Sequence, residues 1–337
     1  MPRQKPLEII GKSEKATKIR KFAEKAAHSE EILFLRGQTG TGKDHLAEYI
    51  HDLGRSGNRF VTVDCGSIPE SLCESILFGH VNGAYTDAKS SAEGLLSVAK
   101  GGTLFLNEVA NMPMTLQTKF LRVLDTTTFR PIGSTSEIPI NTRIIAATNA
   151  NVERAVRDGK LRDDLYHRLN AVTFAIPALR ERKEDIPLLF NYFLGNLGNN
   201  HHFSSAAIEI MESYFWPGNV RELKLTVERA VFHSGEIEVI EKECLGLDLE
   251  NNKNLEDGKK ESEEISDEII RIGPINGLFP RWEEMKNELM KKYLTVLLRK
   301  TKGNQSSVAR ISGLRRQVIG ERMVEFNISK DRDDWLG

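Results

Sequence analysis

Short apolar runs alternate with helix-like stretches through the first half of the chain. Runs of four or five apolar residues are typical of buried parallel strands, because both faces of such strands are covered. The runs that we expect to form strands are residues 32–35, 60–63, 103–106, 143–147 and 172–176. Strands that alternate with helical patterns predict an α/β domain with a largely parallel sheet, which we place at residues 1–176.

The pattern becomes helical after residue 176. Residues 184–245 show helical periodicity and no strand-like run, and residues 216–223 form a turn that leads into a helix. We therefore expect residues 177–247 to form a small helical lid, without strands, on the α/β domain.

The last part of the chain begins with a polar stretch. Residues 251–267 are rich in Asn, Glu, Lys, Ser and Asp, a composition that buries little apolar surface. We expect an acidic, flexible linker at residues 248–275. Apolar positions at helical spacing return in residues 282–298, and two further helical segments flank Gly313. Helix, short turn and helix predict a helix-turn-helix domain at residues 276–337.

Composition limits the class of protein. With 337 residues, 39% hydrophobic and 28% charged, the chain is typical of a soluble protein of two or three domains. Its three cysteines show no zinc-binding spacing and fit a reducing compartment. The N-terminus lacks an export signal, and no apolar stretch is long enough to span a bilayer. We therefore expect a cytoplasmic protein without a membrane partner.

The net charge of −1 hides an uneven distribution. Residues 246–275 carry nine acidic and four basic side chains, a sum of −5, whereas residues 276–337 carry thirteen basic and eight acidic ones, a sum of +5. A basic terminal domain behind an acidic spacer favours nucleic-acid binding. The alternative is a solvated face on an ordinary helical hairpin.

A glycine-rich segment lies between the first predicted strand and a helical pattern. It consists of Gly37, Gln38, Thr39, Gly40, Thr41, Gly42 and Lys43. Strand, glycine-rich turn and helix are the context of a phosphate-binding loop, or P-loop. Backbone N–H groups and the helix N-terminus attract phosphate, and Lys43 reaches the terminal phosphates. Asp44 follows, so the hydroxyl that commonly contacts Mg²⁺ is absent.

The predicted strand at residues 103–106 leads into Asn107 and Glu108. In ATPases with this loop, the first position is usually an acid that holds Mg²⁺, and the second acid polarises the attacking water. Asn107 lacks the charge that holds a divalent ion, and Glu108 remains as a possible base. Two outcomes stay open: hydrolysis is impaired, or Asn107 still orders a magnesium-bound water and turnover is near normal.

The order of these motifs resembles that of the bacterial enhancer-binding proteins, the AAA+ activators of sigma-54 RNA polymerase. Residues 101–106 and 216–223 are similar to family signatures. The most specific match, at four of six positions, is to the family's Gly-Ala-Phe-Thr-Gly-Ala loop. The matching segment is Gly83, Ala84, Tyr85, Thr86, Asp87 and Ala88. Here Tyr85 replaces Phe and Asp87 replaces the second Gly.

The resemblance implies an AAA+ fold in which ATP and Mg²⁺ lie between the subunits of a ring, usually a hexamer. It also implies contact with sigma-54 through residues 83–88 and binding of promoter or enhancer DNA through a Fis-like C-terminal domain. The family roles fall on these residues: Asn149 as γ-phosphate sensor, Arg162 and Arg168 as arginine fingers, Arg221 as lid sensor, and Ile10 and Gly11 at the adenine.

Three of these assignments have plainer alternatives. Arg162 could form a surface ion pair with Asp163 or Asp164, Arg221 could be solvated, and Ile10 could belong to the apolar core. A further residue, Asp64, stands where the family commonly has an Asn that couples Glu108 to the contact loop. Two carboxylates there would repel each other unless one is protonated, and the alternative role for Asp64 is to cap the start of a helix.

At the C-terminal end, DNA binding is assigned to Arg315, Arg316, Gln317 and Arg322, because Arg and Gln suit guanine and adenine edges. We also expect no receiver domain before Ile9, so that control comes from a partner protein, nucleotide level or expression.

Three functions remain open. The first is a sigma-54-type regulator with weakened hydrolysis. The second is a non-hydrolysing, DNA-bound regulator or a co-regulator in mixed rings. The third is an AAA+ remodelling ATPase that acts on another protein, with residues 282–328 as a docking helix pair.

Overall fold

The computed structural model describes residues 8–85, 88, 90–198, 200–235, 237–247, 282–301, 303–312 and 314–329. The chain forms two compact units, Met1–Leu247 and Asp248–Gly337. The first contains a five-stranded sheet and the helices around it, and the described residues of the second form three helices. No helix in the described parts of the chain is both long enough and apolar enough to cross a membrane.

The first unit is built on a five-stranded parallel sheet with the strand order β2-β5-β8-β1-β9. The strands are β1 (Leu33–Arg36), β2 (Phe60–Asp64), β5 (Thr103–Asn107), β8 (Arg143–Thr148) and β9 (Val172–Ala175). The predicted α/β class is therefore confirmed, and each predicted strand differs from the observed one by at most one residue at either end.

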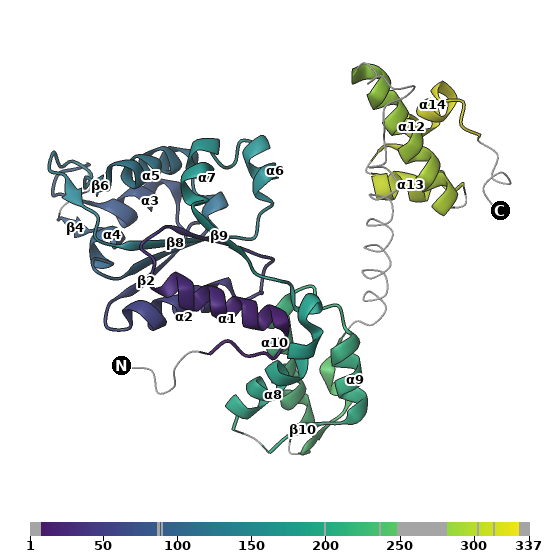
Figure 1. Ribbon diagram of the computed structural model, residues 1–337, viewed down its shortest axis with the longest axis horizontal. Helices are drawn as coiled ribbons and strands as arrows, with labels where there is room; N and C mark the ends of the chain where they lie inside the picture. The colour runs from purple at the N-terminus through teal and green to yellow at the C-terminus, as the bar shows by residue number, and fades with distance from the viewer. Residues whose placement is uncertain are drawn as a thin grey trace. The chain divides into compact units, whose positions relative to one another are not determined.

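Helices cover both faces of this sheet (Figure 1). One face packs against α1 (Glu14–Ala27) and α2 (Lys43–Arg55). The other packs against α3 (Glu70–Phe78), α4 (Leu95–Val98), α5 (Met114–Thr126), α6 (Val152–Arg157) and α7 (Asp163–Leu169).

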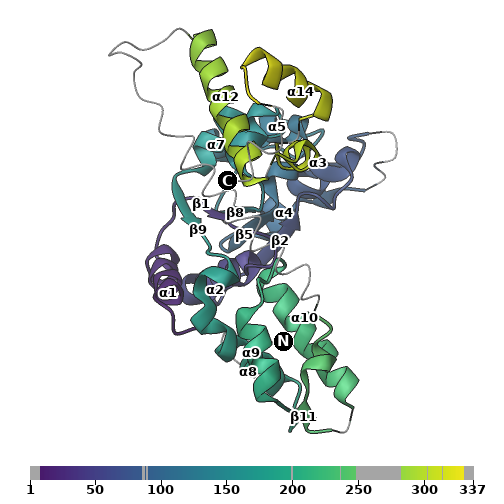
Figure 2. The same cartoon turned by 90° about the vertical axis from the view of Figure 1, so that its right-hand side faces the viewer.

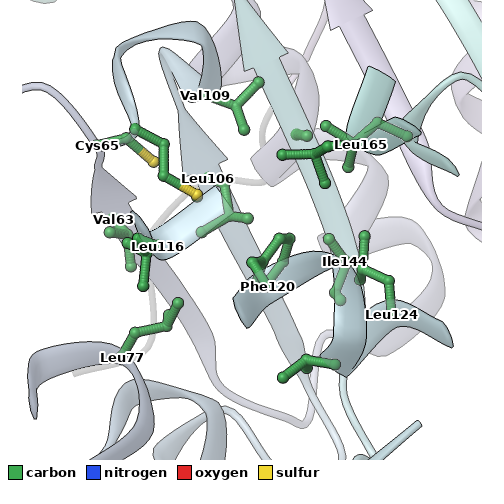
Figure 3. Packing of buried hydrophobic residues seen from close by; sticks show 14 of the residues in the cluster. Val63, Cys65, Leu77, Leu106, Val109, Leu116, Phe120, Leu124, Ile144 and Leu165 are labelled. Atoms are coloured by element: carbon green, nitrogen blue, oxygen red, sulfur yellow. The ribbon is translucent and has the colours of Figure 1, made fainter. Parts of the chain in front are cut away.

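Alternate strand residues enter the two layers because successive side chains point to opposite faces. Leu33 and Leu35 join the α1–α2 layer, whereas Phe34 joins the other. Figure 3 shows this second layer, where Leu106 and Ile144 of the sheet lie beside Phe120 of α5.

Two short antiparallel hairpins project from the α/β part. They pair β3 (Gly79–His80) with β4 (Ala92–Glu93), and β6 (Thr128–Phe129) with β7 (Ile138–Pro139). The hairpins are hydrogen-bonded to each other, since Val81 N donates to Ile132 O at 3.1 Å and Ile132 N donates to Gly79 O at 2.9 Å. A short 3₁₀ helix, η1 (Val109–Asn111), follows β5.

The lid part contains η2 (Leu179–Asp185), α8 (Ile186–Asn196), α9 (Ser205–Ser213), α10 (Asn219–Ser234) and η3 (Lys242–Leu245). Figure 2 shows α8, α9 and α10 grouped together around their own core, in which Trp216 is fully buried. The expectation of no strands here is wrong, because β10 (His202–Phe203) pairs with β11 (Val239–Ile240). Strands of two residues are too short to leave a periodicity of two in the sequence.

A buried carboxylate fastens the chain before α1 to the lid. Asp185 accepts hydrogen bonds from Lys12 N at 2.7 Å, Ser13 N at 2.8 Å and Ser13 Oγ at 2.7 Å. Gly11 passes so close that a Cβ there would lie 2.6 Å from the Asp185 Cγ. Ser13 also caps α1, because its Oγ accepts from Ala16 N.

We expect Asp185→Ala to lower the free energy of unfolding by about 2–4 kcal/mol, because three donors, of which the two on Ser13 are buried, lose a charged acceptor. Chemical denaturation followed by circular dichroism measures the change. The matched control is Asp158→Ala, whose exposed carboxylate pairs with Arg154 on the surface. A loss from Asp185→Ala no larger than that of the control would contradict the role of Asp185.

In the second unit, the residues that the structure describes form a cluster of the helices α12 (Trp282–Lys300), α13 (Gln305–Ser312) and α14 (Arg316–Glu325). Its core contains Leu294, Leu297, Leu298, Val308, Ile319 and Met323. The Asn304 Oδ1 accepts hydrogen bonds from Ser306 N and Ser307 N and so caps α13. Gly313, the predicted turn residue, lies outside the described residues.

Candidate nucleotide site and its surroundings

The P-loop joins β1 to the first residue of α2. Gly40 and Gly42 have φ values of +78° and +99°, which glycine adopts without steric cost. The Lys43 side chain is only 6% exposed. Its Nζ donates to Gly37 O at 3.1 Å and lies 3.3 Å from the Glu108 Oε1. A buried ammonium group therefore stands inside the loop, where it can meet phosphate oxygens.

The second carboxylate oxygen of Glu108 also accepts a hydrogen bond. Its Oε2 accepts a hydrogen bond from Asn149 N at 2.9 Å, and the Asn149 Nδ2 donates to the Thr39 Oγ1 at 2.8 Å. β5 and β1 flank β8 in the sheet, and the carboxyl ends of parallel strands meet at one edge. The fold thereby brings Lys43, Glu108 and Asn149 together from three separate segments.

Asn107 and Asp64 occupy the ends of the neighbouring strands β5 and β2, in register with each other. The Asn107 Oδ1 accepts from Glu108 N at 3.1 Å. The Asp64 Oδ1 accepts from Gly66 N at 3.1 Å, so this carboxylate caps the turn after β2. This is a turn rather than the helix start that the sequence offered as the alternative, since α3 begins only at Glu70 and without a side-chain cap.

Asp44 begins the α2 helix beside Lys43. Partial withdrawal from water raises the pKa of its carboxyl, and the charges of Glu108 and Asp64 add to that rise. Lys43 and Arg221 oppose it. Among the described residues, no group of three or more His, Cys, Asp or Glu side chains could hold a metal ion.

The lid contacts the P-loop from the other side. Arg221 N donates to Gly40 O at 3.2 Å. Ile10 is partly buried against the lid core and Gly11 lies against Asp185, and the placing of both at the adenine stays a prediction. Sequence reasoning missed Asn219 and Arg182, which also bind the loop; the only signal was the position of Asn219 within residues 216–223.

Arg162 and Arg168 lie at the two ends of α7, and both are engaged within the chain. The Arg162 Nη2 lies 2.6 Å from the Asp164 Oδ2, which is the ion pair that the sequence offered as an alternative. The Arg168 Nη2 donates to Leu124 O at 2.9 Å, and its Nε lies 3.4 Å from the Asp125 Oδ1. Among the contacts of the described residues, neither guanidinium bonds to the P-loop of its own chain.

The predicted contact loop lies between β3 and β4. Gly83 N donates to Ala88 O at 2.9 Å, and Ala88 N donates to Tyr85 O at 2.9 Å, so the loop is closed at its base. Tyr85 is 45% exposed. Thr86 and Asp87 lie outside the described residues.

In the second unit, Arg315 precedes α14 as its N-cap residue, and Arg316 and Gln317 form its exposed first turn. The Gln317 Nε2 donates to the Glu321 Oε1 at 3.1 Å. The Arg322 Nη1 lies 2.5 Å from the Glu325 Oε2, so this guanidinium is already paired. Arg315 and Arg316 lie exposed where α14 begins.

Comparison with known proteins agrees with this geometry. Residues 9–175 match the family described as Sigma-54 interaction domain, and residues 180–262 match the AAA+ ATPase lid domain. The transcriptional regulatory protein GlrR of Escherichia coli strain K12 is 39% identical over 91% of this chain and 65% of its own length. The chain thus spans about two thirds of that relative.

A second relative and a solved structure are also similar to this chain. The DNA-binding transcriptional regulator NtrC of Rhizobium meliloti is 34% identical over 97% of this chain and 71% of its own length. The crystal structure of NtrX from Brucella abortus in complex with ATP is 28% identical, covers 95% of this chain and 69% of its own, and has a TM-score of 0.65. The chain belongs to the family of sigma-54-dependent AAA+ transcriptional regulators.

Proposed function

We propose that this protein is a cytoplasmic transcription regulator that binds ATP with Mg²⁺, assembles into a ring, and hydrolyses ATP slowly to act on sigma-54 polymerase. Within that function, residues 83–88 contact sigma-54 and α14 contacts promoter or enhancer DNA. Relatives are named as transcription regulators, and NtrX was crystallised with ATP and with ADP, which supports the proposal.

The observation that carries the proposal is the contact of Lys43 and Asn149 with the two oxygens of Glu108. A bound γ-phosphate would compete with Glu108 for the Lys43 ammonium and the Asn149 backbone N–H, because both are donors. Glu108 would then lose its restraints and could accept a proton from water. Nucleotide binding would in this way release the base that hydrolysis needs.

Slow turnover follows from Asn107. Magnesium prefers carboxylate and phosphate oxygens, and the amide oxygen of Asn107 is neutral and already accepts a hydrogen bond. Asn107 would hold the ion only weakly, through water. The same observation favours a second candidate, in which the protein binds ATP without turnover and acts as a DNA-bound regulator or as a co-regulator in mixed rings.

Hydrolysis in a ring would require Arg162 and Arg168 to leave their own acidic partners and approach the ATP of a neighbouring subunit. Both arginines are half-exposed, and exposed ion pairs of this kind contribute little to stability because water screens them. Each arginine could therefore exchange its carboxylate partner, Asp164 or Asp125, for a triphosphate at a small cost in free energy.

DNA binding is proposed for Arg315, Arg316 and Gln317, which begin the second helix of a helix-turn-helix. We expect Arg316→Ala to weaken binding to a specific site by about 10–100-fold, as loss of a base-reading arginine does. Gel-shift titration at fixed salt measures the effect, with Arg299→Ala on the exposed surface of α12 as control.

Specific retention of genomic fragments would exclude the third function, a remodelling ATPase without DNA contacts. If Arg316→Ala weakened binding to specific and random DNA equally, Arg316 would contact phosphate rather than bases. The polymerase part of the proposal is tested by open-complex formation on a sigma-54 promoter.

A further inference from the structure

Three successive carbonyl oxygens of the P-loop accept hydrogen bonds from the lid. The pairs are Asn219 Nδ2 to Thr39 O at 3.0 Å, Arg221 N to Gly40 O at 3.2 Å, and Arg182 Nη2 to Thr41 O at 3.1 Å. We propose that Asn219 and Arg182 are positioning residues of the nucleotide site, through which the lid holds the P-loop in its phosphate-binding conformation. The proposal rests on nucleotide binding at this loop.

Peptide geometry explains why carbonyl contacts matter for phosphate. In a trans peptide, the C=O of one residue and the N–H of the next point in opposite directions. Donors that hold the carbonyls of Thr39 and Thr41 toward the lid therefore direct the N–H groups of Gly40 and Gly42 away from it. Converging N–H groups are what binds phosphate in such loops. The lid would thus preorganise the anion site without touching the anion.

Asn219 is suited to this role by both ends of its amide. The residue is fully buried, and its Oδ1 accepts from Leu179 N at 2.8 Å. Because that oxygen faces a donor, the Nδ2 must face the P-loop, where it also lies 3.4 Å from the Gln38 Oε1. Its φ of +53° is tolerated by Asn better than by most residues.

Arg182 is a second buried donor on the same loop. Arg182 is only 6% exposed, and its Nε has no hydrogen-bond partner among the described residues. The backbone leaves helical geometry at Arg182, with φ −135° and ψ 50° within η2. Burial of a guanidinium group costs free energy unless the group is paired or hydrogen-bonded. Its contact with Thr41 O shows where this one is directed.

Backbone atoms of the lid also pack directly against the P-loop. A Cβ at Gly40 would lie 2.1 Å from Gly218 O, so the two backbones touch. The Glu222 Oε2 accepts from Gly218 N at 2.7 Å and orders that turn. Arg180 adds a further link, since its Nη1 donates to the Gln38 Oε1 at 2.9 Å. A shift of the lid must therefore disturb the loop.

The test uses Asn219→Asp, which keeps the acceptor for Leu179 N and removes the donor to Thr39 O. The control is Arg229→Met in the same helix, because Arg229 donates to Gly246 O within the lid at 3.2 Å. Amide hydrogen exchange of residues 38–43 is measured without nucleotide, together with exchange of α9 and the dissociation constant for ADP. Asn219→Gly and Arg182→Lys are measured in parallel.

In Asn219→Asp we expect exchange of residues 38–43 to become about tenfold faster and the ADP dissociation constant to rise about tenfold, as loss of one buried hydrogen bond implies. Exchange of α9 in Asn219→Asp should stay unchanged. In Arg229→Met, neither the exchange of residues 38–43 nor the ADP dissociation constant should change. Asn219→Gly should reproduce the effect, and Arg182→Lys should show part of it.

Two results would overturn the proposal. One is exchange of residues 38–43 and ADP affinity within twofold of the natural protein in both Asn219 variants. The other is loss of α9 protection in step with the loop in both, which would assign Asn219 to lid stability alone. If the natural protein does not bind ADP, the proposed function fails, but the nucleotide-free exchange still decides whether the lid orders the loop.

Discussion

Replacement of Lys43 with alanine is expected to raise the dissociation constant for ATP by about 100-fold, or about 2.7 kcal/mol. The ammonium of Lys43 is buried between Gly37 O and Glu108, so it is ordered before the nucleotide arrives. Hydrogen bonds that involve a charged group contribute about 1.5–3 kcal/mol each. Titration calorimetry with ATP and Mg²⁺ measures the loss.

The control for this experiment is Lys18→Ala, because Lys18 forms only an exposed pair with Glu14 on α1. Such a pair stabilises a protein by little, so binding should not change. Removal of Lys43 also leaves Glu108 without its buried cation, and thermal unfolding must show that the variant remains folded. A folded Lys43→Ala that binds ATP as the natural protein does would place the nucleotide elsewhere.

The second large effect is expected for Asn107→Asp, which should raise steady-state phosphate release by about tenfold or more. The new carboxylate adds a full charge at the end of β5, next to Glu108 and opposite Asp64. A metal ion held by charge stabilises the transition state by several kcal/mol, and a tenfold change requires only about 1.4 kcal/mol. Measurement across protein concentrations also shows whether turnover per subunit rises with assembly.

The gain must depend on the base. In an Asn107→Asp background, Glu108→Gln keeps the hydrogen-bonding shape and removes the proton acceptor, so phosphate release should fall back. If Asn107→Asp turns over no faster than the natural protein, Asn107 does not limit hydrolysis. If only the Asn107→Asp protein turns over, the natural chain is a nucleotide-binding regulator and the second candidate function holds.

The strands and the P-loop could be predicted because both depend on short, local patterns. The run of residues 32–35, which includes most of β1 and ends just before Arg36, is apolar at every position because both faces of β1 are covered. Likewise, glycines at 40 and 42 report positive φ values that other residues adopt only with strain.

The contacts between lid and loop could not be predicted, because they join residues far apart in the sequence. Asn219 and Thr39 are separated by 180 positions, and Asp185 and Lys12 by 173. No periodicity encodes such pairs; they depend on how the lid core around Trp216 packs. The β10–β11 pair could not be predicted because each strand has only two residues, too few to show an alternating pattern.

We propose that this chain uses ATP hydrolysis to act on sigma-54 polymerase. The decisive measurement is open-complex formation on a sigma-54 promoter with ATP and with a non-hydrolysable analogue. We predict slow open-complex formation with ATP, faster formation with Asn107→Asp, and none with the analogue. Equal activity with the analogue and with ATP would contradict a role for hydrolysis.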